Sequence, residues 1–62
     1  MKLDQYLKFK CLAATGGQAK YFIQGGEVEV NGHTETRRGR QLSTGDIVTF
    51  QGQSFEVEDG NG

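Results

Sequence analysis

The chain has no proline and no tryptophan, and it has only one cysteine and one histidine. A single cysteine cannot form a disulfide within the chain and offers no pair for a zinc site, which favours a reducing compartment. The sequence also lacks both a signal-peptide pattern and the roughly 20 apolar residues of a membrane span. With 62 residues it holds one small domain, too small for a deep enclosed active site. We therefore expect a cytoplasmic protein that needs no metal or cofactor.

Charge is distributed unevenly along the chain, although the net charge is only -1. All 7 basic residues lie within residues 1–50, whereas the last twelve residues contain three acidic residues and no basic one. Electrostatic recognition depends on local clusters, because charges are screened beyond about 10 Å. The average charge therefore does not exclude a polyanionic partner.

The spacing of apolar residues predicts an amphipathic helix from Leu3 to Ala14. Leu3, Leu7 and Cys11 recur at the interval of one helical face. This pattern predicts that Cys11 is a small buried side chain rather than a nucleophile.

A second helix is predicted to begin at Thr15. The sequence Thr15-Gly16-Gly17-Gln18 matches a capping box, in which the Thr15 side chain accepts an amide hydrogen and Gln18 reaches back to the Thr15 amide. Glycine accepts the left-handed conformation that closes a helix, so the pair Gly25-Gly26 is expected to end it.

The hydrophobic period then changes from helix to strand. Residues 27–30 alternate between glutamate and valine, and Asn31-Gly32 is a strong hairpin-turn signal. Residues 34–41 are expected to form a solvent-facing, partly irregular strand with a candidate bulge at Gly39. Residues 47–50 and 54–57 suggest a second hairpin, and residues 59–62 suggest a frayed tail. These signals predict an α+β fold of two helices followed by four or five short antiparallel strands.

Three arginines within four residues, Arg37, Arg38 and Arg40, are the densest chemical feature. A guanidinium offers a planar fork of donors that fits a phosphate, so this segment suits a phosphate-binding loop. The alternative is a solvated strand face held by exposed ion pairs to Glu27, Glu29 or Glu35, each worth about 0–1 kcal/mol.

The start of the second helix is a further candidate site. Its first amides lack partners within the helix, and Gly16 and Gly17 carry no side chain to shield them from a phosphate. The alternative is that these glycines only permit a tight turn. With Lys8, Lys10 and Lys20, this region and the arginines are expected to form one basic surface.

Aromatic residues offer candidate stacking surfaces for unpaired bases, although in so small a protein they are more often core residues. Tyr6, Phe9 and Tyr21 are the candidates, and Tyr21 is expected to be the most exposed because it lies off the apolar stripe. His33 follows a turn with no carboxylate or nucleophile beside it in the sequence. No catalytic residue is therefore predicted.

The order of these signals, LDQYLK, then TGGQAKYFIQGGEVEVNG, then RRGRQLSTGD, resembles the S-four RNA-binding domain, named after small-subunit ribosomal protein four. The similarity is greatest to its small stand-alone bacterial members of the YaaA and YbcJ type. The resemblance implies two helices packed on a small bent antiparallel sheet, the αL motif, within a single domain of residues 1–58. It also implies that the start of the second helix and the arginines face RNA.

The function expected from residues and resemblance together is a non-enzymatic, monomeric module that binds structured RNA, ribosomal RNA or the ribosome in particular. Its role would lie in ribosome assembly or translation quality control. The expected RNA-binding residues are Lys8, Lys10, Thr15, Gly16, Gly17, Gln18, Lys20, Tyr21, Arg37, Arg38 and Arg40. The alternatives are a protein-interaction adaptor whose basic patch is only a solvated face and, more remotely, a small hydrolase that uses His33.

Overall fold

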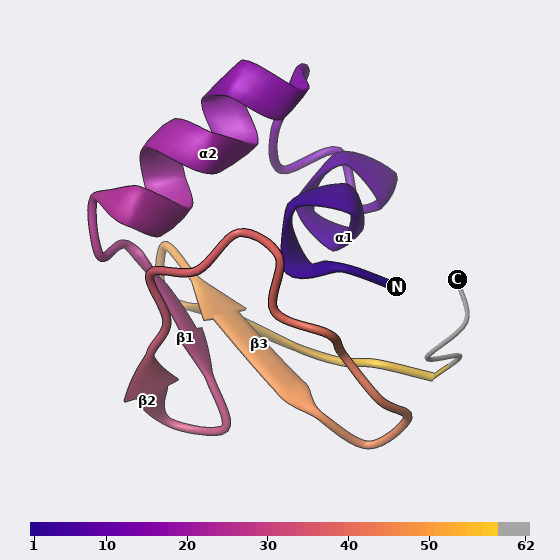
Figure 1. Cartoon of the computed structure of the whole chain (residues 1–62). Helices are drawn as coiled ribbons and strands as arrows, with labels where there is room; N and C mark the ends of the chain where they lie inside the picture. The colour runs from indigo at the N-terminus through magenta and orange to yellow at the C-terminus, as the bar shows by residue number, and fades with distance from the viewer. Residues whose placement is uncertain (59–62) are drawn as a thin grey trace.

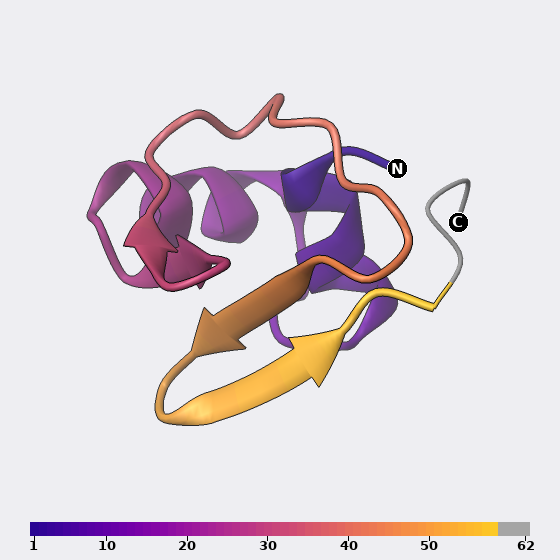
Figure 2. The ribbon, with the colours of Figure 1, turned by 90° about the horizontal axis from the view of Figure 1, so that it is seen from below.

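The computed structural model describes residues 1–58 as two helices followed by an antiparallel sheet. The helices are α1 (Leu3–Phe9) and α2 (Gly16–Gln24), and the strands are β1 (Val28–Val30), β2 (His33–Thr34), β3 (Ile47–Phe50) and β4 (Gln53–Glu56). The strand order is β2-β1-β3-β4. Both helices lie on one face of the sheet (Figure 1), and a view from below has the strands in front of them (Figure 2). The predicted α+β class is confirmed, with four strands. The predicted tail, residues 59–62, lies outside the described residues.

Helix α1 is shorter than the sequence predicted, because it ends at Phe9 and not at Ala14. Cys11 adopts a left-handed conformation with φ of 60°. The Cys11 amide donates to the Lys8 carbonyl and the Leu12 amide to the Leu7 carbonyl, both within 3.0 Å, which is a Schellman motif. Cys11 is consequently exposed, so the prediction that it is buried on the apolar face was wrong.

Helix α2 begins and ends close to the predicted residues. The Thr15 hydroxyl accepts a hydrogen bond from the Gln18 amide at 3.1 Å. The Gln18 side chain accepts from the Ala14 amide at 2.8 Å rather than from the Thr15 amide, so only half of the predicted capping box forms. At the other end Gly26, with φ of 79°, closes a second Schellman motif, and the predicted stop is confirmed.

The sheet is built from two tight hairpins joined by the pairing of β1 with β3. Asn31-Gly32 and Gln51-Gly52 have positive φ at both positions, as a type I′ turn requires. In β1, Val28 and Val30 are buried against the helices whereas Glu29 is exposed on the opposite face, as the alternation predicted.

The segment that joins β2 to β3 is not the strand predicted over residues 34–41. Strand β2 ends at Thr34, and Gln41 forms only an isolated bridge with Lys2. Gly39 therefore lies outside any strand and forms no bulge. The chain instead runs as a loop past the first turn of α1 (Figures 1 and 2) and returns to the core at Leu42, which is 1% exposed.

The core lies between the helices and the sheet. Its buried apolar residues are Leu3, Tyr6, Leu7, Ala13, Ala19, Ile23, Val28, Val30, Leu42, Val48, Phe50 and Val57. Within residues 1–58, neither helix is long and apolar enough to cross a membrane.

Candidate nucleic-acid interface

The arginine segment, residues 37–40, is fixed by its backbone to the start of α1. The Arg40 carbonyl accepts from the Leu3 amide at 2.9 Å, and the Arg38 carbonyl accepts from the Asp4 amide at 3.2 Å. Helix α1 has no side-chain cap at its N-terminus, so these carbonyls satisfy amides that would otherwise lack a partner. The loop and the helix thus stabilise each other.

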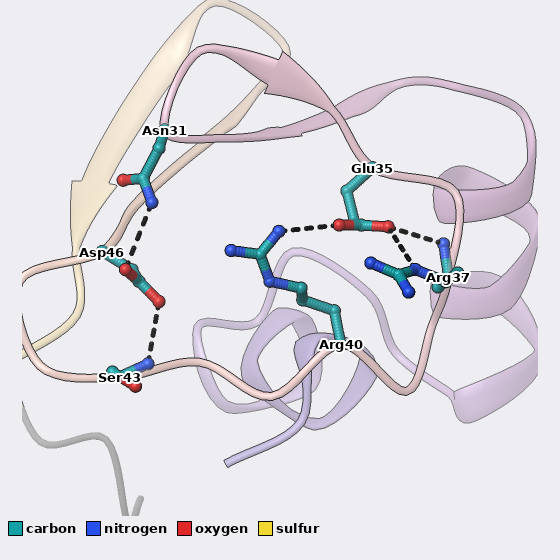
Figure 3. A network of polar contacts seen from close by, with 6 residues as sticks. All are labelled: Asn31, Glu35, Arg37, Arg40, Ser43 and Asp46. Atoms are coloured by element: carbon teal, nitrogen blue, oxygen red, sulfur yellow. Dashed lines mark hydrogen bonds and ion pairs between the residues drawn. The ribbon is translucent and has the colours of Figure 1, made fainter.

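Glu35 is a buried polar residue that connects the arginine segment to the sheet. It is 8% exposed, and its amide donates to the Val28 carbonyl of β1 at 3.0 Å. Its Oε1 accepts from Arg40 Nη1 at 2.8 Å, and its Oε2 accepts from Arg37 Nε and from the Arg37 amide, each at 3.2 Å (Figure 3). The carboxylate is therefore enclosed by two arginines.

These contacts lower the pKa of Glu35 to about 2. The hydrogen bond from Arg40 is the main cause, followed by that from Arg37. The group is therefore fully ionised near neutral pH. Of the three glutamates considered as partners from the sequence, only Glu35 is ion-paired to these arginines within residues 1–58, and its pairs are part-buried rather than surface contacts.

A hollow of about 540 Å³ opens beside these side chains. Its lining residues are Arg37, Gly39, Arg40 and Gln41, and none of them is acidic. A Cβ atom built on Gly39 would meet nothing within 4 Å, so this part of the wall is open. The Arg37 side chain is 78% exposed and that of Arg40 is 32% exposed, so both retain accessible surface.

Arg38 differs from its two neighbours. It is exposed, and its side chain forms no hydrogen bond or ion pair with any other residue from 1 to 58. Its charge is therefore available to a ligand without the loss of an internal contact.

The second predicted element, the start of α2, is also open. A Cβ atom on Gly16 would meet nothing within 4 Å, and one on Gly17 would meet only the Thr15 hydroxyl, at 3.7 Å. Lys20 and Tyr21 are exposed further along the helix. Tyr21 is 71% exposed, which confirms that it is the most exposed of the three aromatic candidates.

Lys10, which caps the C-terminal end of α1, lies away from the arginine segment. The Lys10 ammonium is 5.8–6.0 Å from the ring centroids of Tyr6, Phe9 and Phe55, at the end of α1. The arginine segment contacts the beginning of α1, which is about 10 Å from the Lys10 end of the helix along the helix axis. One continuous basic surface therefore stays a prediction, because the described contacts join Arg37 and Arg40 but not the lysines.

Two features of the structure were not predicted from the sequence, the exposure of Phe9 and the burial of Glu35. Phe9, left ambiguous by the sequence pattern, is 65% exposed. The burial of Glu35 does have a sequence signal: a two-residue turn at Asn31-Gly32 places Glu35 opposite Val28, which faces the core.

A second polar cluster holds the other end of the same loop. Asp46 accepts from the Ser43 amide at 2.8 Å and from Asn31 Nδ2 at 3.2 Å (Figure 3). These two bonds, in that order, are the main causes that lower the pKa of Asp46. Asn31 Oδ1 also accepts from the Ile47 amide at 2.9 Å. The loop of the arginine segment is thus anchored at both ends, by Glu35 and by Asp46.

Fold and sequence together define the class of this protein as a small α+β module with an arginine-rich loop beside a helix pair. The profile of the S4 domain matches residues 1–58, and the chain belongs to this family. It is 45% identical over 56 residues to the "Probable ribosome maturation protein RlbA" of Bacillus subtilis (strain 168), covering 89% of this chain and 79% of that protein. It is 37% identical over 57 residues to the "Putative RNA-binding protein YbcJ" of Escherichia coli (strain K12), covering 92% of this chain and 81% of that protein. The resemblance inferred from the sequence is confirmed.

Proposed function

We propose that this chain is a non-enzymatic module that binds structured RNA, with ribosomal RNA as its target and ribosome assembly as its process. The observation that carries the proposal is the arginine segment, which is fixed to α1 and borders an open hollow without acidic lining. Membership of the S4 domain family and the names of two relatives support it. We further propose that it acts as a monomer in the cytoplasm.

Phosphate recognition provides the mechanism. Arg37, Arg38 and Arg40 offer forked donors to backbone phosphates, and these contacts set the position of the RNA without reading its sequence. The amides of Gly16 and Gly17, which no side chain of their own shields, are proposed to take a further phosphate, because they carry the partial positive charge of a helix start. Thr15 and Gln18 shape this turn through the capping bond.

The remaining contacts are proposed to come from side chains on the helices. Tyr21 presents an exposed ring on which an unpaired base can stack, and Lys20, on the same helix, adds charge. Lys8 and Lys10 would contribute at the end of α1. No step of this mechanism requires a bond to be made or broken, so neither His33 nor Cys11 is assigned a role.

The experiment that tests the proposal is binding to a structured ribosomal RNA fragment as a function of salt, with a DNA duplex of equal length as the control. About five phosphate contacts would give a slope of roughly -4 in log affinity against log salt. The triple variant of Arg37, Arg38 and Arg40 to alanine is expected to bind weakly and with a flatter slope. Glu29→Gln, which changes the charge on the far face of the sheet, is the matched control and should bind as the wild type does or slightly more tightly.

Weak binding of the wild type to every RNA would contradict the proposal. Equal affinity of the folded triple variant and the wild type would remove the arginines from the interface. In that case a protein partner would become the better hypothesis, as the adaptor alternative holds.

A further inference from the structure

We propose that Glu35 is a positioning residue for RNA binding: it holds Arg37 and Arg40 beside the hollow, where their free donors take one phosphodiester group. The inference rests on the proposed function and deepens it. In this inference a negatively charged residue favours the binding of a polyanion, although its charge alone would oppose that binding.

The contacts of Glu35 form a continuous connection from the sheet to the two guanidinium groups. The Glu35 backbone is bonded to Val28, a fully buried residue of β1. Its side chain is only 10% exposed, and each carboxylate oxygen accepts from a different arginine. Both arginine side chains are therefore held by one carboxylate that is fixed to the sheet, although the arginines themselves lie in a loop.

The pairing leaves most of the arginine donors free. A guanidinium has five N–H groups, and Glu35 engages only Nε of Arg37 and Nη1 of Arg40. An arginine side chain can adopt many rotamers, so a flexible arginine loses conformational entropy when a ligand orders it. Glu35 reduces this loss because it orders both side chains before RNA arrives.

The chemistry of the hollow favours a phosphate group as its occupant. Arg37 and Arg40 supply positive charge and forked donors, Gly39 leaves room for an approaching backbone, and Gln41 adds an amide. Asp46, a second carboxylate that interacts electrostatically with Arg40, already accepts hydrogen bonds from Ser43 and Asn31. Arg38 lies next in the chain and adds a charge that no internal contact uses.

The decisive test is the sign of the effect of Glu35→Gln on RNA affinity. This substitution makes the protein more positive by one charge, so an acid that merely shields the arginines would give tighter binding when removed. A positioning residue gives the opposite result, and we expect Kd for the ribosomal RNA fragment to rise roughly tenfold, the size expected when two arginine side chains must be ordered on binding. Glu29→Gln makes the same charge change on the opposite face of the sheet and should not weaken binding.

A second readout separates positioning from loss of structure. Titration of the wild type with inorganic phosphate should shift the side-chain NMR signals of Arg37 and Arg40, and in Glu35→Gln these shifts should be much smaller at equal phosphate concentration. If Glu35→Gln does not fold, Arg40→Lys serves instead: it keeps the charge and the ion pair but removes the fork, and it should also weaken RNA binding several-fold.

The outcomes distinguish this inference from the proposed function. Binding by Glu35→Gln that equals or exceeds that of Glu29→Gln would overturn the positioning role while RNA binding itself stands. Unchanged affinity in Arg40→Lys would overturn the part of the inference in which the forked donors of Arg40 take the phosphodiester group. Failure of the wild type to bind RNA would instead contradict the proposed function.

Discussion

Cys11 and Gly26 occupy the same position in the two helix ends of this protein, the left-handed residue of a Schellman motif, with φ of 60° and 79°. Glycine has no Cβ atom and adopts this conformation freely, whereas another residue in it is strained by about 1–2 kcal/mol. The strain at Cys11 is offset by what the turn achieves, because it brings Ala13 into the core directly after a short helix.

Replacement of Cys11 by glycine should therefore stabilise the protein. We expect Cys11→Gly to raise the free energy of unfolding by about 1 kcal/mol and Tm by about 5 °C, since the exposed thiol contributes little to packing. Thermal unfolding followed by circular dichroism measures the change. Cys11→Ala, which keeps a Cβ atom, is the control and should give little gain; an equal gain in both variants would contradict the explanation.

The helix ends and turns show which parts of the fold follow from local sequence. The start and end of α2 and the first hairpin turn were predictable, because Thr15, Gly25-Gly26 and Asn31-Gly32 act through their own backbone preferences. The second hairpin was predicted with its last strand over residues 54–57, whereas β4 spans Gln53–Glu56, because the turn has only two residues, Gln51 and Gly52. The end of α1 was not predictable, because the left-handed residue there is Cys11 rather than glycine. A spacing of three and four also continues across the helix end, and periodicity alone cannot detect the interruption.

The candidate site was predictable in composition but not in arrangement. The cluster of arginines is visible in the sequence, and ion pairs from these arginines to Glu35 are among the alternatives that the sequence leaves open. The burial of Glu35 follows from the register of β1 with β2, which the Asn31-Gly32 turn sets. The loop conformation depends instead on hydrogen bonds to α1, which is far away in the sequence, so the polar residues 34–41 predicted a strand that does not form.

The low pKa of Glu35 predicts a loss of stability in acid. Because its pKa is about 2 in the folded state and near 4.5 when unfolded, the stabilisation is present above about pH 4.5 and is lost as the pH falls toward 2. We expect the free energy of unfolding of the wild type to fall by on the order of 2 kcal/mol across this range. Urea unfolding at a series of pH values measures it.

The variant that isolates this effect is Glu35→Gln. Its stability should depend less steeply on pH over the same interval, with the remaining slope due in part to Asp46, whose pKa is also lowered. Glu29→Gln controls for the change in net charge. Parallel pH profiles for Glu35→Gln and the wild type would mean that the carboxylate does not gain its stability from the two arginines.

Tyr6 carries a buried hydroxyl that lacks a hydrogen-bond partner within residues 1–58. A buried polar group without a partner is costly, so Tyr6→Phe should leave stability unchanged or raise it by up to about 1 kcal/mol. Burial, and then the negative charge of Glu58, raise the pKa of Tyr6 above 10.0. The wild type should therefore lose stability as the pH rises above about 10, and Tyr6→Phe should lose less.

Thermal unfolding at neutral and alkaline pH tests both parts of this prediction. Tyr21→Phe removes a hydroxyl from a residue that is 71% exposed and is the matched control. A clear loss of stability in Tyr6→Phe at neutral pH would contradict the prediction, because it would show that the Tyr6 hydroxyl forms a hydrogen bond in solution.

Arg38 allows RNA binding to be separated from folding. Because its side chain has no partner within residues 1–58 and its carbonyl, which bonds to Asp4, is unchanged by substitution, Arg38→Ala should alter the free energy of unfolding by less than about 0.5 kcal/mol. Arg40→Ala, in contrast, leaves Glu35 with one arginine fewer and should cost about 1–3 kcal/mol of stability.

The RNA affinity of Arg38→Ala should nevertheless fall, and its salt slope should become shallower by about 1, as expected for the loss of one phosphate contact. Arg38→Lys keeps the charge and should retain the slope while losing part of the affinity, since a lysine cannot form the planar fork. Binding to the ribosomal RNA fragment at several salt concentrations measures both quantities. If Arg38→Ala has the same salt slope and affinity as the wild type, the RNA binds to another face of the protein. The Arg38 side chain has no hydrogen bond or ion pair within residues 1–58 whose loss could mask an effect on RNA binding.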